Sequence, residues 1–150
     1  MIPSALFAFL HFVAVFGLVS TLFLEWQTMS PAPSCEEARR MQRCDLWYGI
    51  FAGIVLFAGF MRVFYFEKGY DFYSASPFFY FKLALFLVIG LISIYPTVRF
   101  IKWRAYTNKG EAPVVSAQEY RRIMNVLRAE LILLLGLALS ASLMARGVGI

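Results

Sequence analysis

The sequence predicts an all-α integral membrane protein, built as a bundle of four membrane-spanning helices. Of the 150 residues, 61% are hydrophobic and only 15% are charged, and the mean hydropathy is +0.69. A soluble domain carries about 25% charged residues, so a water-soluble chain of this size would lack the polar surface to cover itself. Four apolar runs are each long enough to cross a hydrocarbon core, which takes about 20 helical residues.

The four predicted spans cover residues 3–24, 45–66, 77–98 and 126–145. The first run lacks the basic start of a signal peptide and continues to Glu25, so we expect it to be retained as a helix. Ser116 and Glu119 have the spacing of a capping box, which predicts that the fourth helix begins near Ala117. Gly147 and Gly149 suit its end.

The basic residues are distributed unevenly over the connections. Loops 25–44 and 99–125, with the helix ends beside them, hold ten of the 14 basic residues, and the other four are Arg62, Lys68, Lys82 and Arg146. Cytoplasmic loops carry the excess of Lys and Arg. We therefore expect a multi-pass protein with both termini outside the cytoplasm. Cys35 and Cys44 then lie in a reducing compartment and should not form a disulfide.

His11 is the only histidine, and it lies inside the first span. At about 100° per residue, Leu18 and Glu25 follow it on one stripe that we expect to face the bundle interior. Glu130 and Met144 lie on a similar stripe of the fourth span. Ionisable side chains within a span are costly unless they find a partner, so these stripes carry the candidate functional residues.

Helix depth predicts an outer polar cluster of His11, Arg62 and Lys82. Two cations beside a histidine suit an anionic, largely apolar ligand such as a porphyrin with propionates, or a quinone. His11 would ligate haem iron, and Met144 offers a second ligand. The predicted cofactor is therefore haem b, with a quinone as the alternative. Two other interpretations of His11 stay open, a hydrogen bond to a neighbouring helix and a proton-handling role.

A second polar cluster is expected at the inner end, where Glu25 and Glu130 lie at the depth of Arg99 and Arg128. Carboxylates and arginines at helix ends commonly pair or extend to the interface, so we interpret this cluster as paired charges.

Small residues form a further stripe on the second span, comprising Asp45, Gly49, Ala52 and Gly59, with Gly53 beside it. Small residues allow close approach of another helix. That helix could belong to the bundle or to a partner.

Several motifs together resemble a family of small bacterial membrane proteins that carries a domain-of-unknown-function label. These motifs are His11-Phe12, Tyr48-Gly49-Ile50, Gly59-Phe60-Met61-Arg62, Phe81-Lys82-Leu83, Ser93-Ile94-Tyr95-Pro96-Thr97, Glu130-Leu131 and Met144-Ala145-Arg146-Gly147. The resemblance covers nearly the whole chain and implies a membrane-embedded fold without indicating a reaction.

His11, Lys82 and Glu130 also make the chain similar to the HemJ-type protoporphyrinogen oxidases, four-span proteins that bind haem. This similarity implies a haem-binding redox protein. Ala129 and Val126 stand where that pattern has Asn and Arg, so whether the chain is an enzyme stays open. The alternative is a non-catalytic accessory or assembly subunit of a larger membrane complex. Expected partners are membrane lipid and a second copy or complex subunit, with no nucleic acid.

Overall fold

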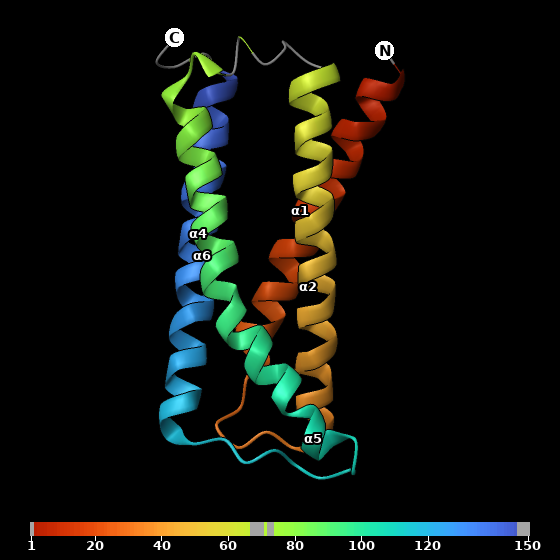
Figure 1. Cartoon of the computed structure of the whole chain (residues 1–150), viewed down its shortest axis with the longest axis vertical. Coiled ribbons are helices and arrows are strands. Elements are labelled where there is room, and N and C mark those ends of the chain that lie inside the picture. The colour runs from red at the N-terminus through yellow and green to blue at the C-terminus, as the bar shows by residue number, and fades with distance from the viewer. Residues whose placement is uncertain (1, 67–70, 72–73, 147–150) are drawn as a thin grey trace.

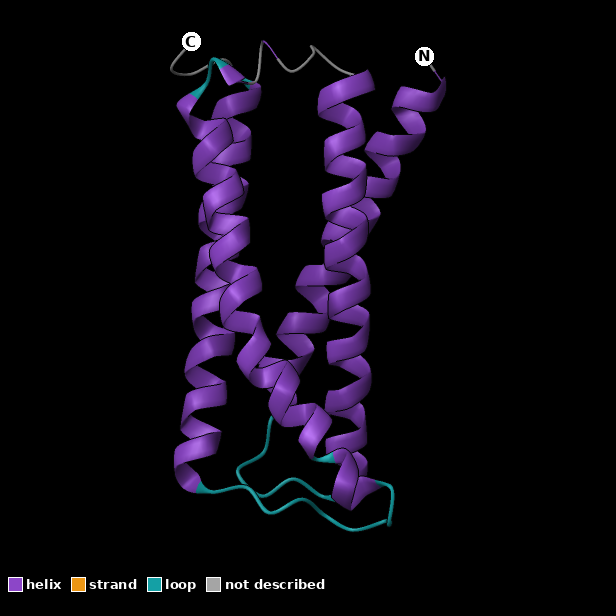
Figure 2. Cartoon of the chain, viewed as in Figure 1, coloured by secondary structure: helices purple, strands orange, loops and turns teal. Residues whose placement is uncertain are grey.

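The computed structural model describes residues 2–66, 71 and 74–146, and these are helical apart from short connections (Figure 2). No strand occurs in this described part, which confirms the predicted all-α class. Lys68, Gly147 and Gly149 lie outside the described residues. The elements are α1 (Ile2–Thr28), α2 (Cys35–Met61) continued by the π-helical turn η1 (Arg62–Phe66), α4 (Pro77–Lys102), α5 (Arg104–Thr107) and α6 (Ala117–Ala145).

Serine caps begin two of the long helices. Ser34 accepts from the Glu37 backbone N–H, and the Glu37 carboxylate accepts in return from the Ser34 N–H, which completes a capping box at the start of α2. Ser116 likewise accepts from Glu119 N–H, so α6 begins at Ala117 as predicted. Helix starts leave backbone donors without intrahelical partners, and these caps satisfy one such donor each.

The long helices are arranged as two pairs, α1 with α2 and α4 with α6 (Figure 1). The start of α1 and the end of α6 lie at one end of the bundle, called here the terminal end, and the segments 29–34 and 108–116 lie at the opposite, loop end (Figure 1). Helix α4 contains Pro96 and runs from beside α6 at the terminal end toward α2 and α5 at the loop end (Figure 1).

The main core lies in the loop-end half, where the two pairs meet. Leu22, Ile123 and Leu127 are fully buried there. The rest of the buried core cluster comprises Leu18, Met29, Ala38, Met41, Tyr48, Phe100, Trp103 and Met124. A smaller cluster of Val63, Phe79 and Met144 lies near the terminal end. The pairs are therefore joined mainly through one half of their length.

Large apolar side chains cover the outside of the four long helices. Examples are Phe16 at 72% exposure, Leu87 at 63% and Leu135 at 73%. A soluble monomer rarely exposes contiguous apolar patches larger than a few hundred Å². Each long helix, with its short continuation, also has the length and hydropathy to cross a membrane. The surface therefore requires an apolar solvent.

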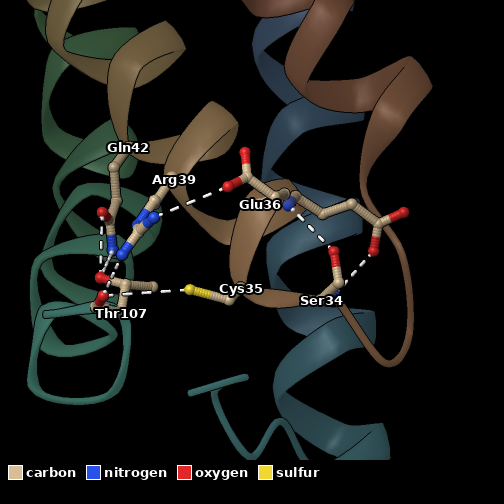
Figure 3. Close-up of polar contacts among 7 residues, drawn as sticks. Ser34, Cys35, Glu36, Arg39, Gln42 and Thr107 are labelled. Atoms are coloured by element: carbon tan, nitrogen blue, oxygen red, sulfur yellow. Dashed lines mark hydrogen bonds and ion pairs between the residues drawn. The ribbon is translucent and has the colours of Figure 1, made fainter. Parts of the chain in front are cut away.

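Polar contacts connect the start of α2 to α5 at the loop end (Figure 3). The Arg39 guanidinium donates to the Thr107 carbonyl at 2.7 Å. The Gln42 amide donates to the Phe100 carbonyl at 3.0 Å and to the Thr107 hydroxyl at 3.3 Å. Cys35 and Cys44 are both free, in agreement with the prediction. These contacts satisfy carbonyls at the end of α4 and of α5 that lack intrahelical partners.

Helices α1 and α2 approach each other closely at Gly17, so a single added methyl group at this position should lower the stability of the fold. A Cβ on Gly17 would lie 2.5 Å from the Phe51 ring, whereas a Cβ on Gly53 would meet nothing within 4 Å. We expect Gly17→Ala to lower the free energy of unfolding by about 1–3 kcal/mol because Phe51 must move. The matched variant Gly53→Ala should cause no loss. Thermal unfolding in detergent measures both, and equal stability would contradict this packing.

Candidate ligand-binding site

A pocket opens between the two helix pairs in the terminal-end half. Its empty volume is about 600 Å³, which includes space that is open to the surroundings. All four long helices contribute to it. The lining residues are His11, Val15, Val55, Leu56, Gly59, Phe60, Val63, Phe79, Lys82, Leu83, Phe86, Leu137 and Ala141.

His11 is held at this pocket by α2. Its Nδ1 lies 3.2 Å from the Val55 carbonyl oxygen. Because a carbonyl only accepts, this hydrogen bond requires the proton on Nδ1, and the lone pair of the neutral ring is then on Nε2. Gly59 packs against the ring, since a Cβ there would lie 3.5 Å from His11 Cε1. The histidine is thus fixed in tautomer and orientation by a neighbouring helix.

Of the four residues predicted to bind a cofactor, the structure brings two into this lining. Lys82 is half-buried and lines the pocket from α4, opposite His11 on α1. The Arg62 guanidinium lies 5.5 Å from the centre of the Phe12 ring and is not part of the lining. Met144 is buried against Val63 and Phe79 and is also outside the lining.

The inner polar residues are buried in the loop-end half. Glu25 and Glu130 are each 1% exposed, as the predicted interior stripes require. The Tyr48 hydroxyl donates to Glu130 Oε1 at 3.3 Å. The Thr97 hydroxyl donates to Asp45 Oδ1 at 2.8 Å. Sequence reasoning assigned Asp45 only to the small-residue stripe, and the signal that could have placed it here is its position at the start of an apolar run.

Arg99 is bound by a carboxylate that the sequence analysis had used only as a helix cap. It donates two hydrogen bonds to Glu119, at 2.8 and 2.6 Å, and the Trp103 indole N–H donates to the same carboxylate at 3.2 Å. Glu119 is 8% exposed, whereas Arg128 is exposed. This network ties the end of α4 to the start of α6, and it belongs to the fold rather than to a ligand site.

The small residues of α2 divide into inward and outward positions. Ala52 packs against the main core, and Gly59 contacts His11. Gly49 and Gly53 are exposed, and a Cβ at either position would meet nothing within 4 Å. Within this chain, the close approach that the stripe permits is therefore used at Gly59.

Four long apolar helices, an apolar outer surface and ionisable groups directed inward define an integral membrane protein. The chain belongs to the predicted membrane protein family DUF2214, whose model matches residues 3–149. No curated protein and no solved structure matches the chain. The similarity to HemJ-type oxidases therefore stays a prediction.

The Arg99 network gives a stability prediction with a matched control. Arg99→Gln leaves the Trp103 N–H as the hydrogen-bond donor to the Glu119 carboxylate among the described residues, and we expect a loss of about 1–3 kcal/mol in the free energy of unfolding. Arg128→Gln, at an exposed position, should change it by less than about 0.5 kcal/mol. Denaturation in detergent micelles, followed by circular dichroism, measures both variants. An equal effect of the two substitutions would show that the pair contributes no stability.

Proposed function

We propose that the protein binds a flat, lipophilic ligand with an anionic or hydrogen-bond-accepting group in the pocket between its two helix pairs. The observation that carries the proposal is the presence of His11 and Lys82 in one apolar lining. Apolar walls with a few convergent polar groups are typical of small-molecule sites. The remaining lining side chains are aliphatic or aromatic, and Phe60, Phe79 and Phe86 supply ring surfaces for a planar molecule.

Haem b is the first candidate ligand, and the lining fits it in two respects. Metal-ligating histidines usually donate their other ring N–H to a carbonyl or carboxylate, and His11 has such a bond through Nδ1 to Val55. Lys82 supplies a cation for a propionate. Among the described lining residues, His11 is the side chain that would hold the haem iron. Bound haem would supply one-electron transfer.

A quinone is the alternative ligand of the same pocket. Lys82 offers hydrogen bonds that a quinone oxygen could accept, whereas neutral His11 has its N–H on the Val55 carbonyl and could accept a hydrogen bond at Nε2 from the hydroxyl of the reduced quinone. A quinone needs no side chain that ligates a metal ion, and its apolar tail suits the lining. Haem and quinone differ in their absorption spectra, so the spectrum of one preparation of purified protein distinguishes them.

We further infer that the loop end faces the cytoplasm of a bacterial inner membrane and that both termini are periplasmic. The support is the concentration of cations at the loop end, where Arg40, Arg43, Lys102, Arg104, Arg121 and Arg122 are exposed. The pocket then belongs to the periplasmic half of the membrane.

The haem assignment predicts the absorption spectrum. Protein expressed with haem precursors and purified in mild detergent should show a Soret band, and His11→Ala should remove or shift it. Lys82→Gln should weaken haem binding about tenfold, the effect of one charge-assisted hydrogen bond of about 1.5 kcal/mol. Lys102→Gln is the matched control, because Lys102 is exposed on the same helix.

The outcomes separate the ligands. A wild-type protein without a Soret band contradicts haem binding, and extraction of a quinone from that preparation would support the alternative. A Soret band that His11→Ala leaves unchanged contradicts the role of His11. Met144→Leu should leave the band in place, because Met144 lies outside the lining, and a shift would instead identify it as a second ligand.

The second candidate function is that of a non-catalytic accessory subunit. The exposed Gly49 and Gly53 favour it, because they leave room for a helix from outside the bundle. Gly49→Leu combined with Gly53→Leu should then lower the native mass of the complex extracted from membranes. A native mass that these substitutions do not change would count against this role.

A further inference from the structure

Three carboxyl groups from three helices lie in the loop-end half, away from the proposed ligand pocket. They are Glu25 on α1, Asp45 on α2 and Glu130 on α6, and each interacts electrostatically with at least one other. Hydroxyl groups reach two of them. Tyr48 donates to Glu130, and Thr97 on α4 donates to Asp45. All four long helices therefore contribute a polar group at this level.

Glu25 differs from the other two in having a fully buried oxygen without a hydrogen-bond donor. The residue is 1% exposed, and its Oε1 has no hydrogen-bond partner among the described residues. Buried polar atoms are nearly always hydrogen-bonded, and an exception calls for an explanation. A buried oxygen without a donor, on one of three carboxyl groups that interact electrostatically, indicates a place for a positively charged ligand.

The charged and titratable neighbours do not neutralise the cluster by contact. Within the described chain, no Lys, Arg or His forms an ion pair with any of the three carboxyl groups. Arg104 on α5 acts electrostatically on Asp45 without forming an ion pair with it among the described residues. Cys44, Arg40 and Arg43 lie nearby on α2. Tyr48 is the other titratable side chain of the cluster. Hydroxyl donors stabilise a carboxylate, but they leave its charge in place.

The charge of the three carboxyl groups favours a cation as their ligand. Carboxylates that share a low-dielectric site repel one another when all are ionised, and a bound cation removes that cost. Among the described residues, no group of three His, Cys, Asp and Glu side chains has the geometry to hold a metal ion. A proton does not need three ligating side chains, because it binds one carboxyl oxygen and forms a hydrogen bond to one acceptor.

We propose that Glu25, Asp45 and Glu130 form a proton-binding site in which Glu25 takes up the proton. One carboxylate oxygen of Glu25 forms an O–H bond with a proton from water, and release reverses this step without electron transfer. Glu25 precedes the last residue of α1, Thr28, by one helical turn, so the proton reaches it from the loop end. His11 is 14 residues away on the same helix, about 21 Å at 1.5 Å per residue.

Infrared spectroscopy of the whole protein in zwitterionic nanodiscs tests the proposal. Wild type should show a pH-dependent C=O band of a carboxylic acid shielded from water, and this band should shift in D₂O buffer. Glu25→Gln should abolish it. Glu111→Gln is the matched control, because Glu111 is exposed in the loop-end connection, and this variant should keep the band.

Isotope labelling keeps the test independent of folding of the variants. The band in wild type should shift with ¹³C-carboxyl glutamate and not with labelled aspartate. Absence of the band at every pH at which the helices remain folded would overturn the proposal. So would a shift with labelled aspartate alone, or a band that persists in folded Glu25→Gln. None of these results depends on haem or quinone binding, so the two proposals succeed or fail separately.

Discussion

The two helix pairs are held together by the buried contact among Leu22, Ile123 and Leu127 in the loop-end half. The positions of the pocket and of the carboxylate cluster depend on this contact. Apolar burial is a weak force between helices in lipid, so close packing and interhelical polar bonds must supply the association. Both are concentrated at this end. The Thr97 hydroxyl on α4 donates to Asp45 on α2, and the Tyr48 hydroxyl on α2 donates to Glu130 on α6. Toward the terminal end the two helix pairs are less tightly joined, and the pocket lies between them.

The ionisable side chains of the pocket and those of the carboxylate cluster lie at two levels of the bundle with different chemistry. The terminal-end level has basic groups, His11 and Lys82, in an apolar lining. The loop-end level has the carboxyl groups of Glu25 and Glu130, both almost fully buried. Since each buried ionisable group costs several kcal/mol in lipid, two such levels are expensive for a chain that only spans a membrane. A ligand at one level and a proton at the other would account for this cost.

Helical periodicity was sufficient to predict much of this arrangement. It predicted the inward direction of Glu25 and Glu130, whereas the length of the apolar runs predicted the four helices and the capping-box spacing predicted the start of α6 at Ala117. It did not predict which polar groups would meet, because that depends on how each helix is rotated and tilted against its neighbours. Arg99 therefore has Glu119 as its partner. For the same reason depth alone grouped Arg62 with His11, although its guanidinium lies over the Phe12 ring.

Cross-linking of the pocket walls is the most direct test of the account, because the central claim is that His11 and Lys82 line one cavity. His11→Cys paired with Lys82→Cys, in a chain with Cys35→Ser and Cys44→Ser, should be joined within one chain by a short bifunctional thiol reagent. His11→Cys paired with Leu91→Cys should not be joined, because Leu91 is 59% exposed on the outside of α4. Equal cross-linking of the two pairs, or none at residues 11 and 82, would contradict the proposed site.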